Sequence, residues 1–505
     1  MQNKKQTVIN VIASLITLSI QLAISFWLSP YVIEKLGEEA FGFINLANNF
    51  VSYAGLIAVA VNSMANRFIS LSYNSGRKDD AEAFFSSVFL INCILFLLVF
   101  LLSIAFTVYI DIFLNISPYL ITQVKLTFFL SFLNMGFSLI GTVYNAAAYT
   151  TNKMYYSSLV QILGNVIKGI LIFLLFALFP AKIYYLSLAT LLGGLLILAG
   201  NFKVTKKLLP NIQVRLKEFD LSKVIQLSKS GIWLLTSNIS NLFLNGLDLL
   251  FSNWFINAAI MGRLSISKQI PYAMAAALSN FSNIFSSSLT KVFCFKNDLG
   301  VAEEATAQLK ILTFLFTTPY AGIIVLGYQF LSLWLSNTEY SSVELREIYY
   351  LMILVLLDII VSTFMYSIHS VFIAMDAVKH YSITLFIASC VSIAVTLILL
   401  HTTKMGVYAI AGTSTVVLGF VHGIIIPIKA AKLQGLKASY YLKTEFKSWM
   451  LLIVLVVIFL CISLVLSFDN WLSFMINAIL LGAVGYVISF ISLVSKQSIY
   501  SLIKK

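Results

Sequence analysis

Residues 84–108 read FFSSVFLINCILFLLVFLLSIAFTV, a run of 25 residues without a charged side chain. A bilayer core requires about 20 apolar residues per helix, and only a helix satisfies all of its backbone polar groups within such a run. The whole chain has this character, because 60% of its 505 residues are hydrophobic and 10% are charged, against about 25% charged in soluble domains. We therefore expect an all-α polytopic membrane protein.

Similar runs recur along the chain and predict about 14 transmembrane helices. They lie near residues 7–28, 41–62, 84–108, 121–147, 159–179, 183–202, 231–254, 266–290, 311–335, 348–374, 381–400, 406–427, 449–468 and 471–493. The division of residues 159–202 into two helices rests on the short polar break from Pro180 to Lys182.

The distribution of Lys and Arg predicts the orientation, since these residues are concentrated in cytoplasmic loops. With the N-terminus in the cytoplasm, 25 of the 33 Lys and Arg fall in cytoplasmic segments. The outer loops are acidic, with Glu38, Glu39 and Glu344 among their residues. We expect a bacterial inner-membrane protein with both termini in the cytoplasm. The net charge of +13 is then a topology signal, and we expect no nucleic-acid partner.

The two halves of the chain are similar at an offset of about 220 residues. Gly42 falls on Gly262, Gln21 on Asn241, and the pair Asn48-Asn49 on Lys268-Gln269. Parallel repeats of this kind occur in transporters, with the substrate site between the halves. The predicted organisation is an N-lobe (1–202), a basic cytoplasmic linker (203–230), a C-lobe (231–430), and a final loop with two further helices (431–505).

Polar side chains follow one face of the predicted seventh helix, where Asn238, Asn241, Asn245, Asp248 and Ser252 recur at steps of three and four. Weaker polar faces occur in other predicted helices. Their members include Gln21, Asn45, Asn48, Asn49, Arg67 at the end of the second helix, Lys168, Lys268, Gln269, Tyr272 and Asp358. Since unpartnered polar groups are costly in lipid, we expect these faces to line a hydrated substrate cavity. Scattered Ser and Thr are expected to join helices instead.

The charged members of this set leave alternatives open. Lys168 and Asp358 could line the cavity or form buried ion pairs, and Lys268 could reach the membrane interface with its long side chain. Asp248 and Asp358 are the candidates for coupling transport to H⁺ or Na⁺. The lone His369 and His422 are expected to be structural.

Known catalytic and nucleotide-binding motifs are absent from the sequence. It contains no GxxxxGK[ST], HExxH, CxxC or GxSxG. We therefore expect neither an enzyme nor an ATPase, and transport driven by an ion gradient, the membrane potential or the gradient of the substrate. No metal or organic cofactor is predicted.

Several stretches resemble polysaccharide transporters. The segment from Leu28 to Gly42, LSPYVIEKLGEEAFG, is similar to their first outer loop, and Leu247-Asp248 followed by Ile270-Pro-Tyr272 resembles their seventh and eighth helices. The chain is thereby identified as a member of the lipid-linked oligosaccharide flippase branch of the multidrug/oligosaccharidyl-lipid/polysaccharide (MOP) exporter superfamily.

This resemblance implies a MATE-like fold of two pseudo-symmetric six-helix lobes and two C-terminal helices that form a groove for a lipid tail. It implies an undecaprenyl-pyrophosphate-linked oligosaccharide as the substrate, for O-antigen or capsule synthesis, with membrane lipid, a polysaccharide polymerase and a chain-length regulator as partners. The chain departs from the family in having few intramembrane arginines, so that Lys168, Lys268 or Arg67 would have to hold the pyrophosphate.

Three alternatives to an oligosaccharide flippase differ in what they require of the chain. A cation-coupled multidrug exporter of the same fold would need an aromatic, acidic pocket, whereas the polar faces here are rich in amides. A peptidoglycan-precursor flippase would resemble the chain in helix number but use several cavity arginines. A membrane glycosyltransferase or polymerase would carry a large outer loop or an acidic catalytic motif, and the sequence has neither.

Overall fold

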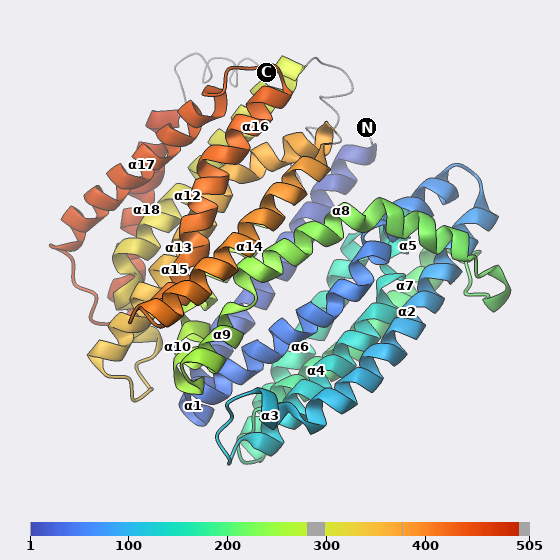
Figure 1. The fold of residues 1–505 in the computed structure, drawn as a ribbon, viewed down its shortest axis with the longest axis horizontal. Coiled ribbons are helices and arrows are strands. Elements are labelled where there is room, and N and C mark those ends of the chain that lie inside the picture. Colours follow the sequence, from blue (N-terminus) through green and yellow to red (C-terminus); the bar gives the residue numbers. More distant parts are fainter. Residues whose placement is uncertain (1, 280–297, 376, 494–505) are drawn as a thin grey trace. The chain divides into compact units, whose positions relative to one another are not determined.

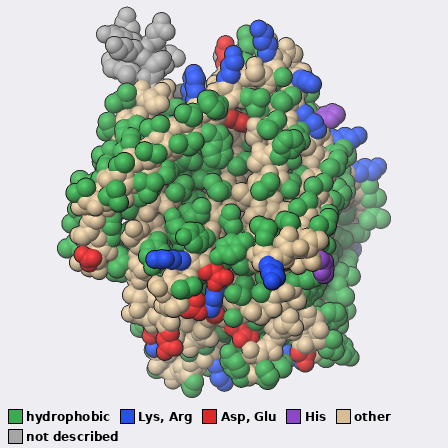
Figure 2. Space-filling view, turned by 60° about the vertical axis from the view of Figure 1, so that its left-hand side comes forward, with side chains coloured by type: hydrophobic (Ala, Val, Ile, Leu, Met, Phe, Trp, Pro, Cys, Tyr) green, Lys and Arg blue, Asp and Glu red, His purple; other side chains and the backbone are tan. Residues whose placement is uncertain are grey.

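The computed structural model of the chain describes residues 2–279, 298–375 and 377–493 and is helical throughout those ranges, without a β-strand. Eleven helices there are long and apolar enough to cross a membrane. Hydrophobic side chains cover much of the molecular face in Figure 2, and charged ones are few among them. The expected all-α multi-pass fold is confirmed.

The first two predicted transmembrane helices form one element, α1 (Gln2–Asn74), which is broken at Gly37. Gly37 has φ 83° and ψ 169°, a conformation that residues with a Cβ atom rarely adopt. The break therefore divides α1 into two segments, close to the boundary that the hydrophobic runs predict.

The helices of the described chain form two compact units, of which the first ends at Ile266. After α1, this unit contains a set of helices that run roughly parallel to one another (Figure 1). They are α2 (Lys78–Val108), α4 (Ile121–Thr142), α6 (Tyr155–Leu178) and α7 (Tyr184–Leu208), with the short α3 (Ile110–Phe113) and α5 (Asn145–Thr150) between them. Part of its core consists of Ile69, Phe84, Phe85, Tyr144 and Leu227. The non-helical segment between α6 and α7 confirms the division predicted at Pro180.

The predicted seventh helix is interrupted, but both residues at the break, Gly246 and Leu247, keep right-handed helical backbone angles. The expected single polar face stays a prediction. The predicted helix consists of α8 (Leu221–Asn245) and α9 (Asp248–Phe255), separated at Gly246 and Leu247. The three asparagines of the polar face therefore lie on α8, while Asp248 and Ser252 lie on α9. A further helix, α10 (Ala258–Ser267), follows.

The second unit begins at Ser267. Residues 269–279 are helical, and the rest of the predicted eighth helix lies outside the described residues. The next helices are α12 (Asp298–Trp334), α13 (Ser342–Ala374), α14 (Val378–Thr402), α15 (Val407–Phe420), the π-helix η2 (Val421–Ile425), α16 (Ile426–Leu433), α17 (Tyr440–Ser463) and α18 (Trp471–Leu493). Tyr320, Phe364 and Phe459 belong to its core.

One helix boundary follows the predicted repeat. Helix α4 begins at Ile121 and α13 at Ser342, a separation of about 220 residues, which is the offset of the sequence matches. The predicted linker at 203–230 is largely helical, because α7 ends at Leu208, α8 begins at Leu221, and the 3₁₀ turn η1 (Leu216–Glu218) lies between them. The division into two six-helix lobes stays a prediction.

Candidate functional site

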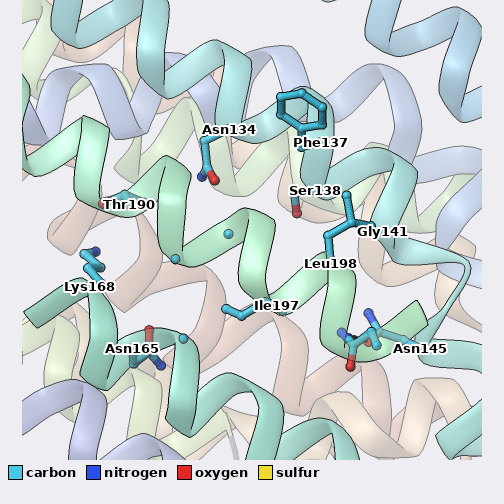
Figure 3. A pocket seen from close by; sticks show the side chains of 14 residues that line it. Asn134, Phe137, Ser138, Gly141, Asn145, Asn165, Lys168, Thr190, Ile197 and Leu198 are labelled. Carbon is cyan, nitrogen blue, oxygen red and sulfur yellow. Dashed lines mark hydrogen bonds between the residues drawn. The ribbon is translucent and has the colours of Figure 1, made fainter. Parts of the chain in front are cut away.

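A polar pocket lies within the first unit, between α4, α6 and α7. Its volume is about 210 Å³. Seven polar side chains line it, namely Asn134, Ser138, Asn145, Asn165, Lys168, Thr190 and Asn201. In Figure 3, Asn134 and Ser138 lie on one side of α7, and Asn165 and Lys168 lie on the other. The pocket therefore joins carboxamide, hydroxyl and ammonium groups from several membrane-spanning helices.

Glycines line part of this pocket, and because they have no side chain they leave space where the helix surfaces meet. A Cβ atom on Gly193 would lie 3.0 Å from the carbonyl oxygen of Gly164, so α6 and α7 approach each other closely at this point. A Cβ atom on Gly194 would lie 2.2 Å from Asn134 Oδ1. The Asn134 carboxamide thus occupies space that any larger residue at position 194 would take.

Lys168 is the only cationic side chain in the pocket lining, which contains no carboxylate. It lies near the middle of α6, and over the described part of the chain no Asp or Glu forms an ion pair with it. A lysine at the centre of a membrane helix costs about 2.5–3.5 kcal/mol on insertion scales. Of the two alternatives for Lys168, the structure favours cavity lining over an ion pair.

The carboxamide of Asn201 also lines the pocket, and only part of its hydrogen-bonding capacity is used. Its side-chain nitrogen donates a hydrogen bond to Asn145 Oδ1 at 3.1 Å. The residue is 4% exposed. Its Oδ1 atom is buried and has no hydrogen-bond partner in the part of the protein that the structure describes. Since buried polar atoms are nearly always paired, this oxygen is a candidate acceptor for a donor on a bound molecule, such as a sugar hydroxyl.

Other predicted site residues meet at the interruption between α8 and α9. Asn49 Nδ2 donates to the carbonyl oxygen of Gly246 at 3.0 Å, and the Tyr53 hydroxyl donates to the same oxygen. Asn45 Nδ2 donates to Ser265 Oγ at 2.6 Å. These side chains donate hydrogen bonds to the Gly246 carbonyl oxygen at the end of α8 and to Ser265, and they thereby join α1 to α8 and α10. The sequence predicts this structural role only for serine and threonine.

A third group lies in the second unit, around Lys268. This residue interrupts the helix between α10 and residues 269–279, and its ammonium lies 5.1 Å from the centre of the Tyr272 ring. Lys268 and Asp358 are each 5% exposed and carry opposite charges. The burial of Lys268 disfavours the alternative that it reaches the membrane interface, and the choice for Asp358 between cavity lining and an ion pair stays open.

The remaining predicted residues are not brought into these groups. Gln21, Asn48, Arg67, Asn238 and Asn241 are exposed, while Asn245, Asp248 and Gln269 are partly buried. Asn238 Nδ2 donates to Leu234 O within its own helix at 2.9 Å. Their assignment to a substrate cavity stays a prediction.

Sequence reasoning missed most of the pocket around Lys168. It considered Lys168 on α6, but not Asn134 and Ser138 on α4 or Thr190 and Asn201 on α7. Two signals in the sequence could have found them. Asn134 and Ser138 are spaced by one helical turn, and the Gly193-Gly194 pair marks a surface where another helix or a ligand can approach closely.

Comparisons with known proteins agree with the resemblance found in the sequence. A family model described as Polysaccharide biosynthesis protein matches residues 8–290. The uncharacterized membrane protein EpsK of Bacillus subtilis (strain 168) is 24% identical over 506 residues, which cover 98% of this chain and 97% of EpsK.

Solved structures show the same fold. An inward-facing multidrug resistance MATE family transporter of the MOP superfamily superposes with a TM-score of 0.66 at 14% identity, covering 83% of this chain and 95% of that one. The lipid II flippase MurJ, in an inward closed conformation, gives a TM-score of 0.62 at 16% identity, covering 96% and 98%. The expected MATE-like fold is confirmed.

Proposed function

The chain belongs to the polysaccharide biosynthesis protein family, and we propose that it moves an undecaprenyl-pyrophosphate-linked oligosaccharide across the bacterial inner membrane. The cargo would be a repeat unit for a surface polysaccharide such as O-antigen or capsule. Only the sugar and pyrophosphate head needs a polar route, because the lipid tail can stay in the bilayer.

One observation carries this proposal, namely the pocket that combines Lys168 with carboxamides and has no carboxylate in its lining. An ammonium group binds phosphate oxygens through charge-assisted hydrogen bonds. The Asn134, Asn165 and Asn201 carboxamides can donate to and accept from sugar hydroxyls. The pocket therefore has the groups that an anionic, hydroxyl-rich head requires.

The same observation disfavours export of cationic drugs. A cation would need carboxylates or aromatic faces around it, but the lining of this pocket has one lysine and Phe137 as its single aromatic residue. Export of a peptidoglycan precursor is a narrower rival, since that cargo is also an anionic lipid-linked sugar, and complementation of a peptidoglycan-flippase deficiency tests it directly.

We propose that the transporter works by alternating access, with both termini in the cytoplasm and H⁺ or Na⁺ coupled through Asp248. Asp358 is the second candidate, since it is buried in the second unit together with the oppositely charged Lys268. A polysaccharide polymerase and a chain-length regulator are the expected partners of this pathway step.

The test compares Lys168→Met, Lys168→Arg and the control Lys203→Met in cells that lack the wild-type gene. Lys203 is an exposed lysine on α7 outside the pocket, so its variant makes the same charge change elsewhere. Loss of a charge-assisted hydrogen bond of about 1.5–3 kcal/mol should lower surface polysaccharide about tenfold or more and accumulate the lipid-linked precursor. Lys168→Arg should retain most activity. Normal surface polysaccharide with Lys168→Met at normal protein abundance would overturn the proposal.

A further inference from the structure

An apolar groove runs along the second unit between α14 and the continuous stretch of α15, η2 and α16. Its volume is about 560 Å³. The α14 side consists of His380, Ile383, Thr384, Ile387, Ala388 and Val391, and the opposite side of Val416, Val417, Phe420, Val421, Ile425 and Lys429. On each side of the groove, these residues are spaced so that they lie along one face of the helix and form one stripe.

The groove is long, and its apolar part is exposed. At 1.5 Å per residue, the α14 stripe is about 16 Å long and the opposite stripe about 20 Å. Several of its side chains are strongly exposed, including Ile387 at 58%, Val416 at 73% and Phe420 at 59%. In a membrane-spanning protein, such a surface accepts a hydrocarbon chain.

One end of the groove is cationic. Lys429 Nζ donates a hydrogen bond to Thr384 Oγ1 at 2.7 Å, which places the ammonium across the groove from α16 to α14. His380 lies one helical turn before Thr384 on the same face. No Asp or Glu belongs to the lining. The groove is thus apolar over most of its length and basic at one end, which complements an amphiphile with an anionic head.

We propose that this groove binds the carrier lipid, with the isoprenoid chain of a polyprenyl phosphate along the stripes and its phosphate at Lys429. This inference rests on the proposed function. Apolar burial gives no preference among lipids inside a bilayer, so selectivity has to come from the shape of the chain and from the head. A single row of side chains on each helix accommodates one chain, whereas a glycerophospholipid carries two.

Native mass spectrometry of the purified full-length protein tests this inference with three probes. They are undecaprenyl phosphate, the uncharged undecaprenol, and phosphatidylglycerol, which is anionic but has two chains. We expect the protein to retain undecaprenyl phosphate. Retention of undecaprenol should be about tenfold weaker because it lacks the charge-assisted contact, and retention of phosphatidylglycerol about tenfold weaker because its two chains do not fit the groove.

Two matched pairs of variants locate the binding. Lys429→Met should weaken retention of undecaprenyl phosphate about tenfold, while Lys432→Met, at an exposed lysine on the same helix, should not. Val391→Trp should block the groove, whereas Ile398→Trp, at an exposed position further along α14 that does not line the groove, should leave retention unchanged. Equal retention of phosphatidylglycerol, or retention unaffected by Val391→Trp, would overturn the inference.

The failure of this inference can be separated from the failure of the proposed function. Lys168→Met should stop transport but leave undecaprenyl phosphate in the groove, since the two sites lie in different units. If the wild-type chain transports no lipid-linked oligosaccharide, the proposed function is wrong. If it transports normally but does not retain undecaprenyl phosphate, only the groove assignment is wrong.

Discussion

Gly42 and Gly262 pack against each other, and a Cβ atom on Gly42 would lie 2.9 Å from the Gly262 Cα atom. The two glycines are counterparts at the repeat offset of 220 residues. The same offset relates Asn45 to Ser265, which are hydrogen-bonded at 2.6 Å. These two contacts therefore bring α1 and α10 together at positions that the sequence offset relates.

The first prediction concerns this crossing. In Gly262→Ala, the new Cβ atom would lie 2.2 Å from the carbonyl oxygen of Glu38, which is backbone and moves only together with α1. We expect a loss of about 1–3 kcal/mol of stability from overpacking, seen as a lower midpoint in thermal unfolding of the purified protein. Gly322→Ala on α12 is the control, since nothing lies within 4 Å of its Cβ position. Equal midpoints for the two variants would show that the crossing is not tightly packed.

The second prediction concerns the pocket around Lys168. Gly194→Ala would place a Cβ atom 2.2 Å from Asn134 Oδ1, so the Asn134 side chain has to turn into the pocket. We expect reduced surface polysaccharide with little change in the thermal midpoint, because a single side chain can yield. In the control Gly55→Ala on α1, outside the pocket lining, the nearest atom is Met135 Cε at 3.9 Å, at the far end of a flexible side chain. Full activity of Gly194→Ala would argue against a role for Asn134 in transport.

The third prediction concerns Lys268 and Asp358, which are both buried in the second unit. Removing one charge of such a pair leaves the other uncompensated, at a cost of about 3–5 kcal/mol. We expect Asp358→Leu to lower the thermal midpoint strongly, and the double variant Lys268→Met/Asp358→Leu to recover most of it. If the single and double variants are equally unstable, the two charges do not stabilise each other.

Transport by the double variant separates the two alternatives for Asp358. A purely structural pair predicts that surface polysaccharide returns together with stability. A coupling role predicts a stable protein that remains inactive, and whose activity in vesicles no longer responds to an imposed H⁺ or Na⁺ gradient.

Much of the fold could be predicted because it depends on local sequence. Apolar runs predict membrane helices one at a time, and the polar break at Pro180–Lys182 marks the end of α6 without reference to any other part of the chain. The offset was visible in Gly42 and Gly262, because close packing of α1 against α10 demands small residues on both helices.

The candidate site was less predictable because it depends on contacts between distant residues. A lone glycine is tolerated within many helices, so the sequence around Gly246 does not reveal that the helix ends there. The donors that satisfy its carbonyl oxygen, Asn49 and Tyr53, lie on another helix. Lys268 likewise has the pattern of an interfacial lysine, and its burial in the second unit depends on tertiary packing that the local sequence does not show.

The last prediction tests the interruption at Gly246. The carbonyl oxygen of Gly246 accepts hydrogen bonds from both Asn49 and Tyr53, so either donor alone can satisfy it. We expect Tyr53→Phe and Asn49→Leu each to cost about 0.5–1.5 kcal/mol. The double variant leaves the oxygen without a side-chain donor and should cost more than the sum of the two, by about 1 kcal/mol or more. Thermal unfolding of the four proteins gives this coupling energy, and strictly additive effects would mean that water or backbone groups satisfy the oxygen instead. Because interrupted helices in transporters bind substrates and ions at their free ends, a strong coupling accompanied by lost transport would connect this hydrogen-bonded break to the transport cycle.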